Sequence, residues 1–313
     1  MKKIPIVFCF DDNLELQAGV CLTSLLMNAA PDTFYDIFIL HAASCRFPGG
    51  KLNGLSDKFH NCRITYRVVN NDFDNSFEIR GITVATYYRL LIPDLIPEYD
   101  KIMYSDVDVI FLGDLAGIYE ETDLTDYYVA GVSVPYSDIS DYMEKVIHLK
   151  CTEYISAGNI IMNSRKMREE GIVEKFKEVA KGNWRYQDMD TLNLVCRGKV
   201  KYLPPWYCVV GTISEILSDE HQPYYSKEEV DQVLNQGIIH YNGPKPWEQY
   251  CINFDIWWEY YRKSVFFHPK AYYNFFSRKM NDYDSLTLWR RVKILLRFFK
   301  DGRIRFTKKW YEV

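Results

Sequence analysis

Short apolar runs alternate with amphipathic segments along most of the chain. Segments with strand composition are Ile4–Phe10, Tyr35–His41, Arg63–Val69, Lys101–Tyr104, Val109–Leu112, Tyr154–Met162 and Gly237–His240. Segments with helical spacing are Leu16–Ala29, Thr83–Leu91, Ile172–Lys181 and Asp188–Cys196, and we expect Asp188 to cap the last of them. This alternation predicts an α/β fold with a mostly parallel sheet that helices cover on both faces.

Acidic side chains follow two of the predicted strands. Asp11 comes directly after the first strand, and Asp106 comes shortly after Lys101–Tyr104. In open α/β sheets, ligands bind beyond the carboxyl ends of the strands. We therefore expect Asp11 and Asp106 to belong to one site.

An Asp-x-Asp pair can hold one hard cation, which in turn binds two phosphates. The chain has four such pairs: Asp72/Asp74, Asp106/Asp108, Asp188/Asp190 and Asp282/Asp284. Strongly apolar segments flank Asp106 and Asp108, and burying two neighbouring carboxylates is costly unless a cation or hydrogen-bond donors compensate. A metal site is one interpretation of this pair. The alternative is that the two acids cap a helix or pair with Arg or Lys.

His240 ends the last apolar run. From the residues alone, His240 is as compatible with a metal ligand as with a core histidine whose hydrogen bonds are all made inside the protein. Gly243 would let the backbone approach a ligand closely, and Lys245 supplies a charge suited to phosphate. Trp247 would anchor this loop.

Four segments together resemble the family 8 glycosyltransferases, which are retaining enzymes with the GT-A fold. They read Ile6-Val-Phe-Cys-Phe-Asp-Asp-Asn13, Ala85-Thr-Tyr-Tyr-Arg-Leu90, Tyr104-Ser-Asp-Val-Asp-Val109 and His240-Tyr-Asn-Gly-Pro-Lys-Pro-Trp247. Their order and spacing are similar to those of bacterial enzymes that build lipopolysaccharide and related surface glycans. The resemblance implies that a hexose, galactose or glucose, moves from a UDP-sugar donor to a glycan or lipid-linked acceptor.

The resemblance also implies roles for single residues. Asp106, Asp108 and His240 match three ligands of Mn²⁺ (or Mg²⁺). The positions that match the donor site are Asp11 and Asn13 for the uridine, Arg89, Val107 and Ser156 further along the donor, and Gly243 and Lys245 in the loop over the diphosphate. Asp188 matches an acid that recognises hydroxyls of the donor hexose, and we expect Asp188 and Lys245 to take part in catalysis.

Three positions depart from the family pattern. Leu14 replaces an aromatic residue that often stacks on the base, Met189 replaces a glutamine, and Ser156 replaces an asparagine. Retention requires either a covalent intermediate on Asp188 or attack from the face of the departing phosphate. Met189 cannot act as a nucleophile, which favours the second route, but the sequence leaves both open.

Two other functions fit parts of the sequence. A haloacid-dehalogenase-type phosphohydrolase would use Asp106-Val-Asp-Val109 as its nucleophile motif, although that motif normally lies in the first strand. A catalytically weak or dead sugar-nucleotide-binding protein of the same fold is favoured by Met189 and Ser156.

Composition narrows the functional classes further. The 313 residues are 48% hydrophobic and 26% charged, which is typical of a globular protein, and the formal net charge of −4 argues against nucleic-acid binding. The eight cysteines form no C-x-x-C pair, no apolar signal core follows Met1, and no run reaches the roughly 18 apolar residues of a membrane span. We therefore expect a cytoplasmic protein with reduced thiols. Its oligomeric state is not indicated.

The composition changes near Phe254, after which aromatic and then basic residues dominate. We expect a GT-A catalytic domain over residues 1–253 and a helical extension over 254–313. Residues 286–313 contain nine Lys/Arg and two acids. Read as a helix, this stretch has an apolar face beside a basic stripe, which predicts peripheral contact with the anionic inner face of the cell membrane. The alternative is a terminal helix packed on the domain.

Two segments beside the expected site have the glycine, proline and polar content of lids. They are Asn71–Gly81 and Gly243–Trp247. We expect both to order over the donor, and ordinary surface loops are the alternative.

Overall fold

The computed structural model describes residues 1–70, 84–133, 140–210, 228, 232–284 and 287–300, so the predicted lid Asn71–Gly81 lies outside the described residues. The strands are β1 (Lys2–Cys9), β2 (Thr33–Ala42), β3 (Cys62–Val69), β4 (Lys101–Ser105), β5 (Val109–Phe111), β6 (Val129–Ser133), β7 (Ile155–Asn163), β8 (Val200–Tyr202) and β9 (Ile238–His240). The α-helices are α1 (Glu15–Met27), α2 (Gly54–Lys58), α3 (Ile92–Leu95), α4 (Ala116–Glu121), α5 (Ser140–Tyr142), α6 (Ser164–Glu169), α7 (Ile172–Val179), α8 (Gln187–Val195), α11 (Val233–Gln236), α12 (Phe254–Lys263), α13 (Pro269–Asp284) and α14 (Leu288–Lys300). Short 3₁₀ or π turns are η1 (Asp12–Leu14), η2 (Lys51–Asn53), η3 (Val84–Leu91), η5 (Met143–Ile147), η6 (Cys151–Glu153) and η7 (Pro205–Tyr207).

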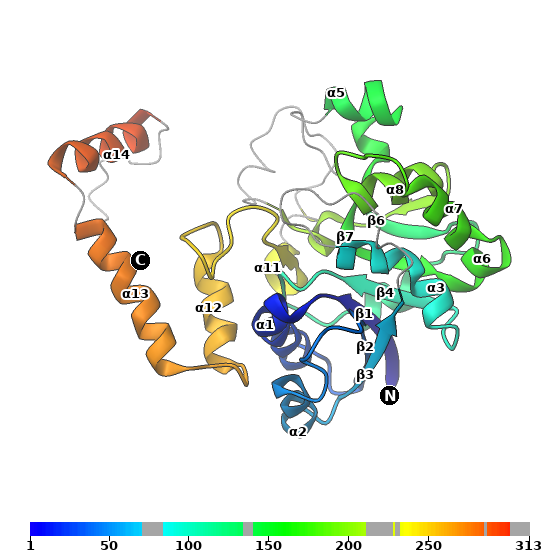
Figure 1. The fold of residues 1–313 in the computed structure, drawn as a ribbon, viewed down its shortest axis with the longest axis horizontal. Helices are drawn as coiled ribbons and strands as arrows, with labels where there is room; N and C mark the ends of the chain where they lie inside the picture. Colours follow the sequence, from blue (N-terminus) through cyan, green and yellow to red (C-terminus); the bar gives the residue numbers. More distant parts are fainter. Residues whose placement is uncertain (71–83, 134–139, 211–227, 229–231, 285–286, 301–313) are drawn as a thin grey trace. The chain divides into compact units, whose positions relative to one another are not determined.

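A seven-stranded sheet organises the part of the chain that precedes Phe267. Its strand order is β3-β2-β1-β4-β7-β6-β8 (Figure 1). Neighbouring strands are parallel except where β7 pairs with β4 and β6, which it meets antiparallel. The prediction of a mostly parallel α/β sheet is therefore confirmed.

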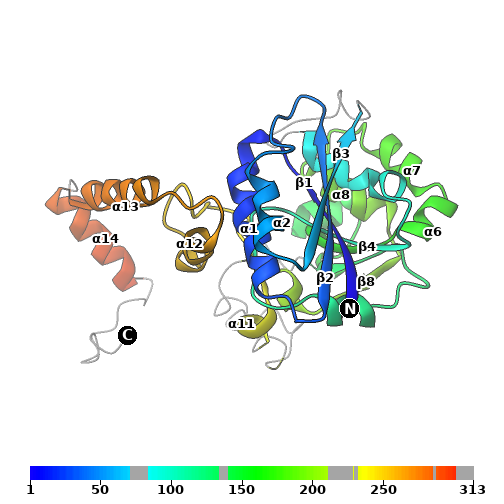
Figure 2. The same cartoon turned by 90° about the horizontal axis from the view of Figure 1, so that it is seen from below.

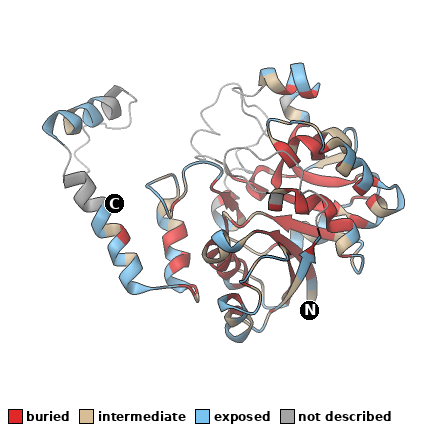
Figure 3. Ribbon diagram, in the orientation of Figure 1, coloured by how far each residue is buried: buried red, intermediate tan, exposed pale blue. Residues whose placement is uncertain are grey.

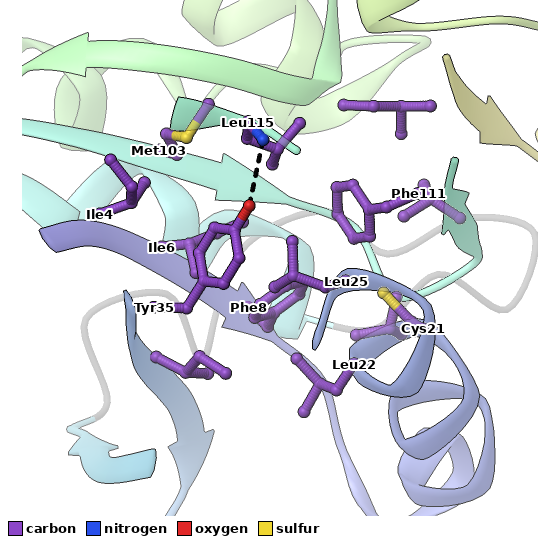
Figure 4. Close-up of a cluster of buried hydrophobic side chains, with 14 of the residues drawn as sticks. Ile4, Ile6, Phe8, Cys21, Leu22, Leu25, Tyr35, Met103, Phe111 and Leu115 are labelled. Carbon is purple, nitrogen blue, oxygen red and sulfur yellow. Dashed lines mark hydrogen bonds between the residues drawn. The ribbon is translucent and has the colours of Figure 1, made fainter. Parts of the chain in front are cut away.

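Helices cover both faces of this sheet, because the strands carry apolar side chains on both faces. Ile6 and Phe8 of β1 point toward α1 and pack with Leu22 in one apolar cluster (Figure 4). Val7 lies on the opposite face and belongs to a second cluster, which includes Phe176 of α7. Figure 2 shows α1 and α2 on one side of the strands and α6 and α7 on the other. Such continuous burial is typical of parallel strands with helical crossovers.

A separate two-stranded sheet carries the last part of the predicted site. β5 and β9 pair antiparallel, with Val109 opposite His240. The backbone N–H of Tyr241 donates to the carbonyl of Asp108 at 3.0 Å. This pairing places the end of β9 directly beside the segment between β4 and β5.

The contacts divide the chain into two compact units, Met1–Phe266 and Phe267–Val313. The first unit includes α12, which packs on α1. Phe266 lies so close to Gly19 of α1 that an added Cβ at this glycine would be 2.2 Å from the ring. A functional division at 253/254 stays a prediction, since these contacts group α12 with the sheet.

The second unit contains α13 and α14. Apolar side chains on α14 are largely exposed, among them Leu288 at 78% and Trp289 at 75%, and Figure 3 shows little burial on this helix. None of the helices in the described ranges combines the length and apolar character needed to cross a bilayer.

Candidate active site

Three side chains converge where β4, β5 and β9 meet. Asp106 follows β4, Asp108 precedes β5, and His240 ends β9. One ligand atom from each lies within 4.8 Å of the other two. The His240 Nε2 atom is 3.7 Å from Asp106 Oδ2 and 3.3 Å from Asp108 Oδ1. Val107, between the two acids, buries its side chain in the core, so only its backbone can face a ligand here.

This group fits a divalent cation. Two carboxylate oxygens and one imidazole nitrogen are a donor set that Mn²⁺ and similar ions accept. Gly158 of β7 leaves the room that the donors need, because an added Cβ would lie 2.4 Å from His240 Cε1 and 2.8 Å from Asp106 Oδ2. Any other residue at position 158 would push these two ligands out of place.

Opposite charges dominate the electrostatics of this group. Burial would raise the pKa of Asp108, but the charges of His240 and Lys245 outweigh it and hold that pKa below its ordinary value. Burial would lower the pKa of His240, whereas Asp108 raises it well above the ordinary value. An imidazole must lose its proton to bind a metal, so a bound cation would take the place of that proton.

Arg89 of η3 contacts one acid of each of two Asp-x-Asp pairs, Asp106 and Asp188. Its Nη2 atom is 2.8 Å from Asp106 Oδ1, and its Nε atom is 3.0 Å from Asp188 Oδ2. The guanidinium also donates to the carbonyl of Ala157 at 2.7 Å and lies 4.4 Å from the ring centroid of Tyr104. Arg89 is only 5% exposed, and a buried cation of this kind is stable only when such partners surround it.

Asp188 does not cap α8, and that prediction is wrong. The N-cap of α8 is Tyr186, and Asp188 lies inside the first turn, where its Oδ1 accepts from the hydroxyl of Thr86 at 2.7 Å. The Nε–H of Arg89 is directed at the carbonyl of Thr86, so Asp188 Oδ2 accepts no hydrogen bond from the described residues. Burial raises the pKa of Asp188 to about 6, although Arg89 opposes this.

Asp190 lies in the same turn of α8, but its carboxylate contacts a different set of residues. It accepts hydrogen bonds from Tyr154 OH at 2.5 Å, from Tyr142 OH at 2.6 Å and from the backbone N–H of Tyr186 at 2.8 Å. Asp190 is completely buried. Its carboxylate is thus satisfied by structural partners, and Met189 packs beside the same cluster.

Lys245 lies on the loop after β9. Its Nζ atom is 2.5 Å from Asp108 Oδ2 and donates to the carbonyl of Tyr241 at 2.6 Å. The indole N–H of Trp258 donates to the carbonyl of Pro246 at 3.0 Å, which ties the loop to α12. At Gly243 an added Cβ would meet nothing within 4 Å, so packing within the protein does not require a glycine there.

Comparison with known proteins identifies the family of this chain. The model of glycosyl transferase family 8 matches residues 5–251. The chain belongs to glycosyltransferase family 8. It is 29% identical over 262 residues to a Haemophilus influenzae protein whose name places it among the glycosyltransferases, covering 80% of this chain and 74% of that one. It is 24% identical over 260 residues to the lipopolysaccharide 1,2-glucosyltransferase of Escherichia coli K12, with the same coverage of 80% and 74%.

The solved structures agree on the fold. The galactosyltransferase LgtC, crystallised with donor and acceptor sugar analogues, matches with a TM-score of 0.70 and 25% identity over 85% of this chain and 98% of its own. The predicted GT-A fold and the family resemblance are therefore confirmed.

The contacts described for the expected uridine residues of this family 8 chain do not involve the metal group. Asp11 Oδ1 accepts from the backbone N–H of Asn13 at 2.9 Å and so caps η1. Asn13 lines an open cavity of about 530 Å³ together with Arg46 and Lys51. Leu14 packs on the core and offers no aromatic ring. Direct contacts unite Arg89, Asp106, Asp108, Asp188, His240 and Lys245, whereas the contacts described for Asp11, Asn13 and Gly243 do not include this group.

Ser156 of the glycosyltransferase lies on β7, behind His240. It is 9% exposed, and its Oγ atom is 3.6 Å from Cys208 Sγ, which in turn is 3.6 Å from His240 Nδ1. Thr86, Tyr104 and Cys208 all contact site residues, yet none was predicted. Thr86 and Tyr104 fall inside the segments that resemble the family, which was the available signal, and Cys208 carried no signal at all.

Proposed function

We propose that this chain is a metal-dependent, retaining hexosyltransferase. It moves galactose or glucose from a UDP-sugar to a glycan or lipid-linked acceptor, in the synthesis of lipopolysaccharide or a related surface polysaccharide. The observation that carries the proposal is the convergence of Asp106, Asp108 and His240 beside Lys245, in a chain of family 8. The names of the E. coli glucosyltransferase and of LgtC support the substrate class.

The residues around the metal group would bind the donor diphosphate. A bound Mn²⁺ (or Mg²⁺) supplies positive charge that stabilises a nucleoside diphosphate as leaving group. Lys245 already lies against Asp108 and adds a second positive charge at the same place. The backbone at Val107 and Gly243 completes this end, while Asp11 and Asn13 receive the uridine.

Asp188 and Ser156 belong to the sugar end of the proposed site. Asp188 Oδ2 is a buried acceptor without a hydrogen bond from the described residues, and a hydroxyl of the donor hexose would satisfy it. Because Arg89 and Thr86 engage the same carboxylate, we favour a binding role over a covalent one. The acceptor oxygen then bonds to the anomeric carbon as the bond to the UDP oxygen breaks, and the acceptor proton passes to the departing phosphate.

A panel of nucleotide sugars tests this function. The full chain is incubated with each UDP-hexose and Mn²⁺, with and without glycan acceptors, and UDP release is measured. We expect release with UDP-galactose or UDP-glucose that depends on Mn²⁺. Binding without turnover for every donor and acceptor would instead favour a sugar-nucleotide-binding protein that has lost catalysis.

We also propose that α14 contacts an anionic membrane from the cytoplasmic side, where lipid-linked acceptors lie. Leu288, Trp289, Leu295 and Leu296 are 50–78% exposed, and Arg290, Arg291 and Lys293 lie on the same helix. Exposed apolar and basic residues together are typical of interfacial helices, in which each cation near anionic lipid contributes about 1 kcal/mol. Arg297 and Lys300 also belong to α14, whereas Arg303, Arg305, Lys308 and Lys309 lie outside the described residues.

Co-sedimentation with vesicles tests this contact. We expect the full chain to bind vesicles rich in anionic lipid and to ignore neutral ones, and a Trp289→Ser/Leu296→Ser variant to bind several-fold more weakly. Equal behaviour with both kinds of vesicle would overturn the proposal.

A further inference from the structure

A buried thiol lies behind the proposed metal ligand His240. The Cys208 Sγ atom is 3.6 Å from His240 Nδ1, whereas the other ring nitrogen, Nε2, faces the carboxylates. Two main-chain hydrogen bonds fix this contact: Val209 N donates to Ile238 O at 2.8 Å, and His240 N donates to Val209 O at 2.9 Å. The thiol and the imidazole are therefore held side by side by backbone that depends on neither side chain.

Neighbouring polar groups orient the sulfur. Asn159 is completely buried on β7, and its Oδ1 accepts from Ser105 Oγ at 2.7 Å. This hydrogen bond turns the amide nitrogen of Asn159 toward Cys208 Sγ, 3.7 Å away. The thiol hydrogen is directed at Ser156 Oγ, 3.6 Å away. With its hydrogen engaged there, the sulfur presents its lone pairs to Asn159 and His240.

The chain of contacts also links two parts of the metal group. Ser105 directly precedes Asp106 and pairs with Asn159 across β4 and β7. From Asn159 the chain continues through Cys208 to His240, whose other nitrogen faces Asp106 and Asp108. A shift of the thiol would therefore change the position of His240, the third proposed metal ligand.

The geometry points to Cys208 as a positioning residue that fixes both the ring and the tautomer of His240. The sulfur accepts the Nδ1–H, so the lone pair of Nε2 is directed at the cation between the two carboxylates. This inference rests on the proposed metal site. Metal-bound histidines generally donate their second N–H to an outer partner, and loss of that partner typically weakens metal binding about 10- to 100-fold. A thiol in this place is an unusual, weakly polar form of that partner.

Metal affinity measured without turnover tests the inference. The dissociation constant of Mn²⁺ is determined by calorimetry in the presence of UDP for the wild type, Cys208→Ala, Cys208→Ser and Cys196→Ala. Cys196 is the matched control, since it is also a buried cysteine in an apolar cluster, and none of its described contacts involves Cys208, His240 or the two carboxylates. Thermal unfolding of the metal-free proteins is measured in parallel. Should the alanine variant fail to fold, Cys208→Val keeps the volume and still lacks the acceptor.

We expect Cys208→Ala to raise the Mn²⁺ dissociation constant about 10-fold or more, and Cys208→Ser to stay within about 3-fold of the wild type because a hydroxyl can accept the same hydrogen. Cys196→Ala should lower the unfolding temperature but leave the dissociation constant unchanged. Equal affinity in Cys208→Ala and Cys196→Ala would overturn the positioning role. Absence of Mn²⁺ binding in the wild type would instead overturn the metal site itself, and the inference with it.

Discussion

Two Asp-x-Asp pairs lie within a few side chains of each other in this protein, and the backbone gives them opposite uses. Asp106 and Asp108 lie between two strands, and both carboxylates reach His240 while Val107 enters the core. Asp188 and Asp190 lie in the first turn of α8, where residues two apart project to different sides. One meets Arg89, and the other meets buried tyrosines.

The difference shows which arrangement of an acidic motif fits a cation. In the first pair, one oxygen of each carboxylate lies near the same imidazole nitrogen, and the other oxygen of each pairs with Arg89 or Lys245. The second pair shares no common point, because each carboxylate is engaged by different groups. In this protein, the Asp-x-Asp pair whose oxygens lie near a common imidazole is therefore the one that is not in a helix.

The largest expected effect concerns turnover in the first pair. Asp106→Asn and Asp108→Asn each remove a charged ligand, and we expect UDP release to fall about a thousandfold, the scale on which losing one preorganised charge-stabilising group acts. Asp141→Asn, at an exposed ion pair with Lys145, should leave the rate unchanged. An Asp106→Asn enzyme with wild-type turnover would show that the two pairs do not differ as described.

The next largest effect is on the stability of the fold and concerns Asp190 of the second pair. Asp190→Ala leaves two tyrosine hydroxyls and one backbone N–H without their acceptor, so we expect a loss of about 3 kcal/mol or more in the free energy of unfolding. Urea denaturation measures this, with Asp141→Ala as a control that should change little. A loss below about 1 kcal/mol would mean that Asp190 is not the anchor of α8.

The smallest expected effect is a pH dependence of the free energy of unfolding that arises from Asp188. Its pKa is raised from 3.8 to about 6, so the folded protein holds this proton more tightly than the unfolded chain does. The resulting stability is complete below about pH 4 and is lost as the pH rises through about 6. From pH 5 to 7.5 the metal-free wild type should lose about 1 kcal/mol relative to Asp188→Asn in urea denaturation. Parallel stability curves would contradict the burial of this carboxyl.

Much of the fold followed from the apolar pattern. Long buried strands such as β1 and β2 have apolar residues on both faces, and their bounds were predicted to within two residues. β8 was not predicted, because it has three residues and none is fully buried. The segment Thr83–Leu91 was expected as a helix and forms the 3₁₀ turn η3 from Val84, which aims Arg89 at both acidic pairs.

The candidate site was predicted less evenly. Charged residues in recognisable segments, Asp106 and His240 above all, were found because their neighbours in sequence match a family. The helix cap at Asp188 was wrong, because α8 begins before Asp188 and the carboxylate pairs with Arg89 and Thr86, which are distant in the chain. Cys208 was missed, since its role depends on main-chain pairing with β9 that no local pattern encodes.

The central claim is that Asp106, Asp108 and His240 hold the divalent ion through which UDP binds. The most direct measurement is the dissociation constant of UDP, by calorimetry, with and without Mn²⁺, for the wild type, Asp108→Asn and Asp190→Asn. We expect Mn²⁺ to tighten UDP binding at least about 10-fold in the wild type and in Asp190→Asn, and to have no effect in Asp108→Asn. UDP binding by Asp108→Asn that responds to Mn²⁺ as the wild type does would contradict the account.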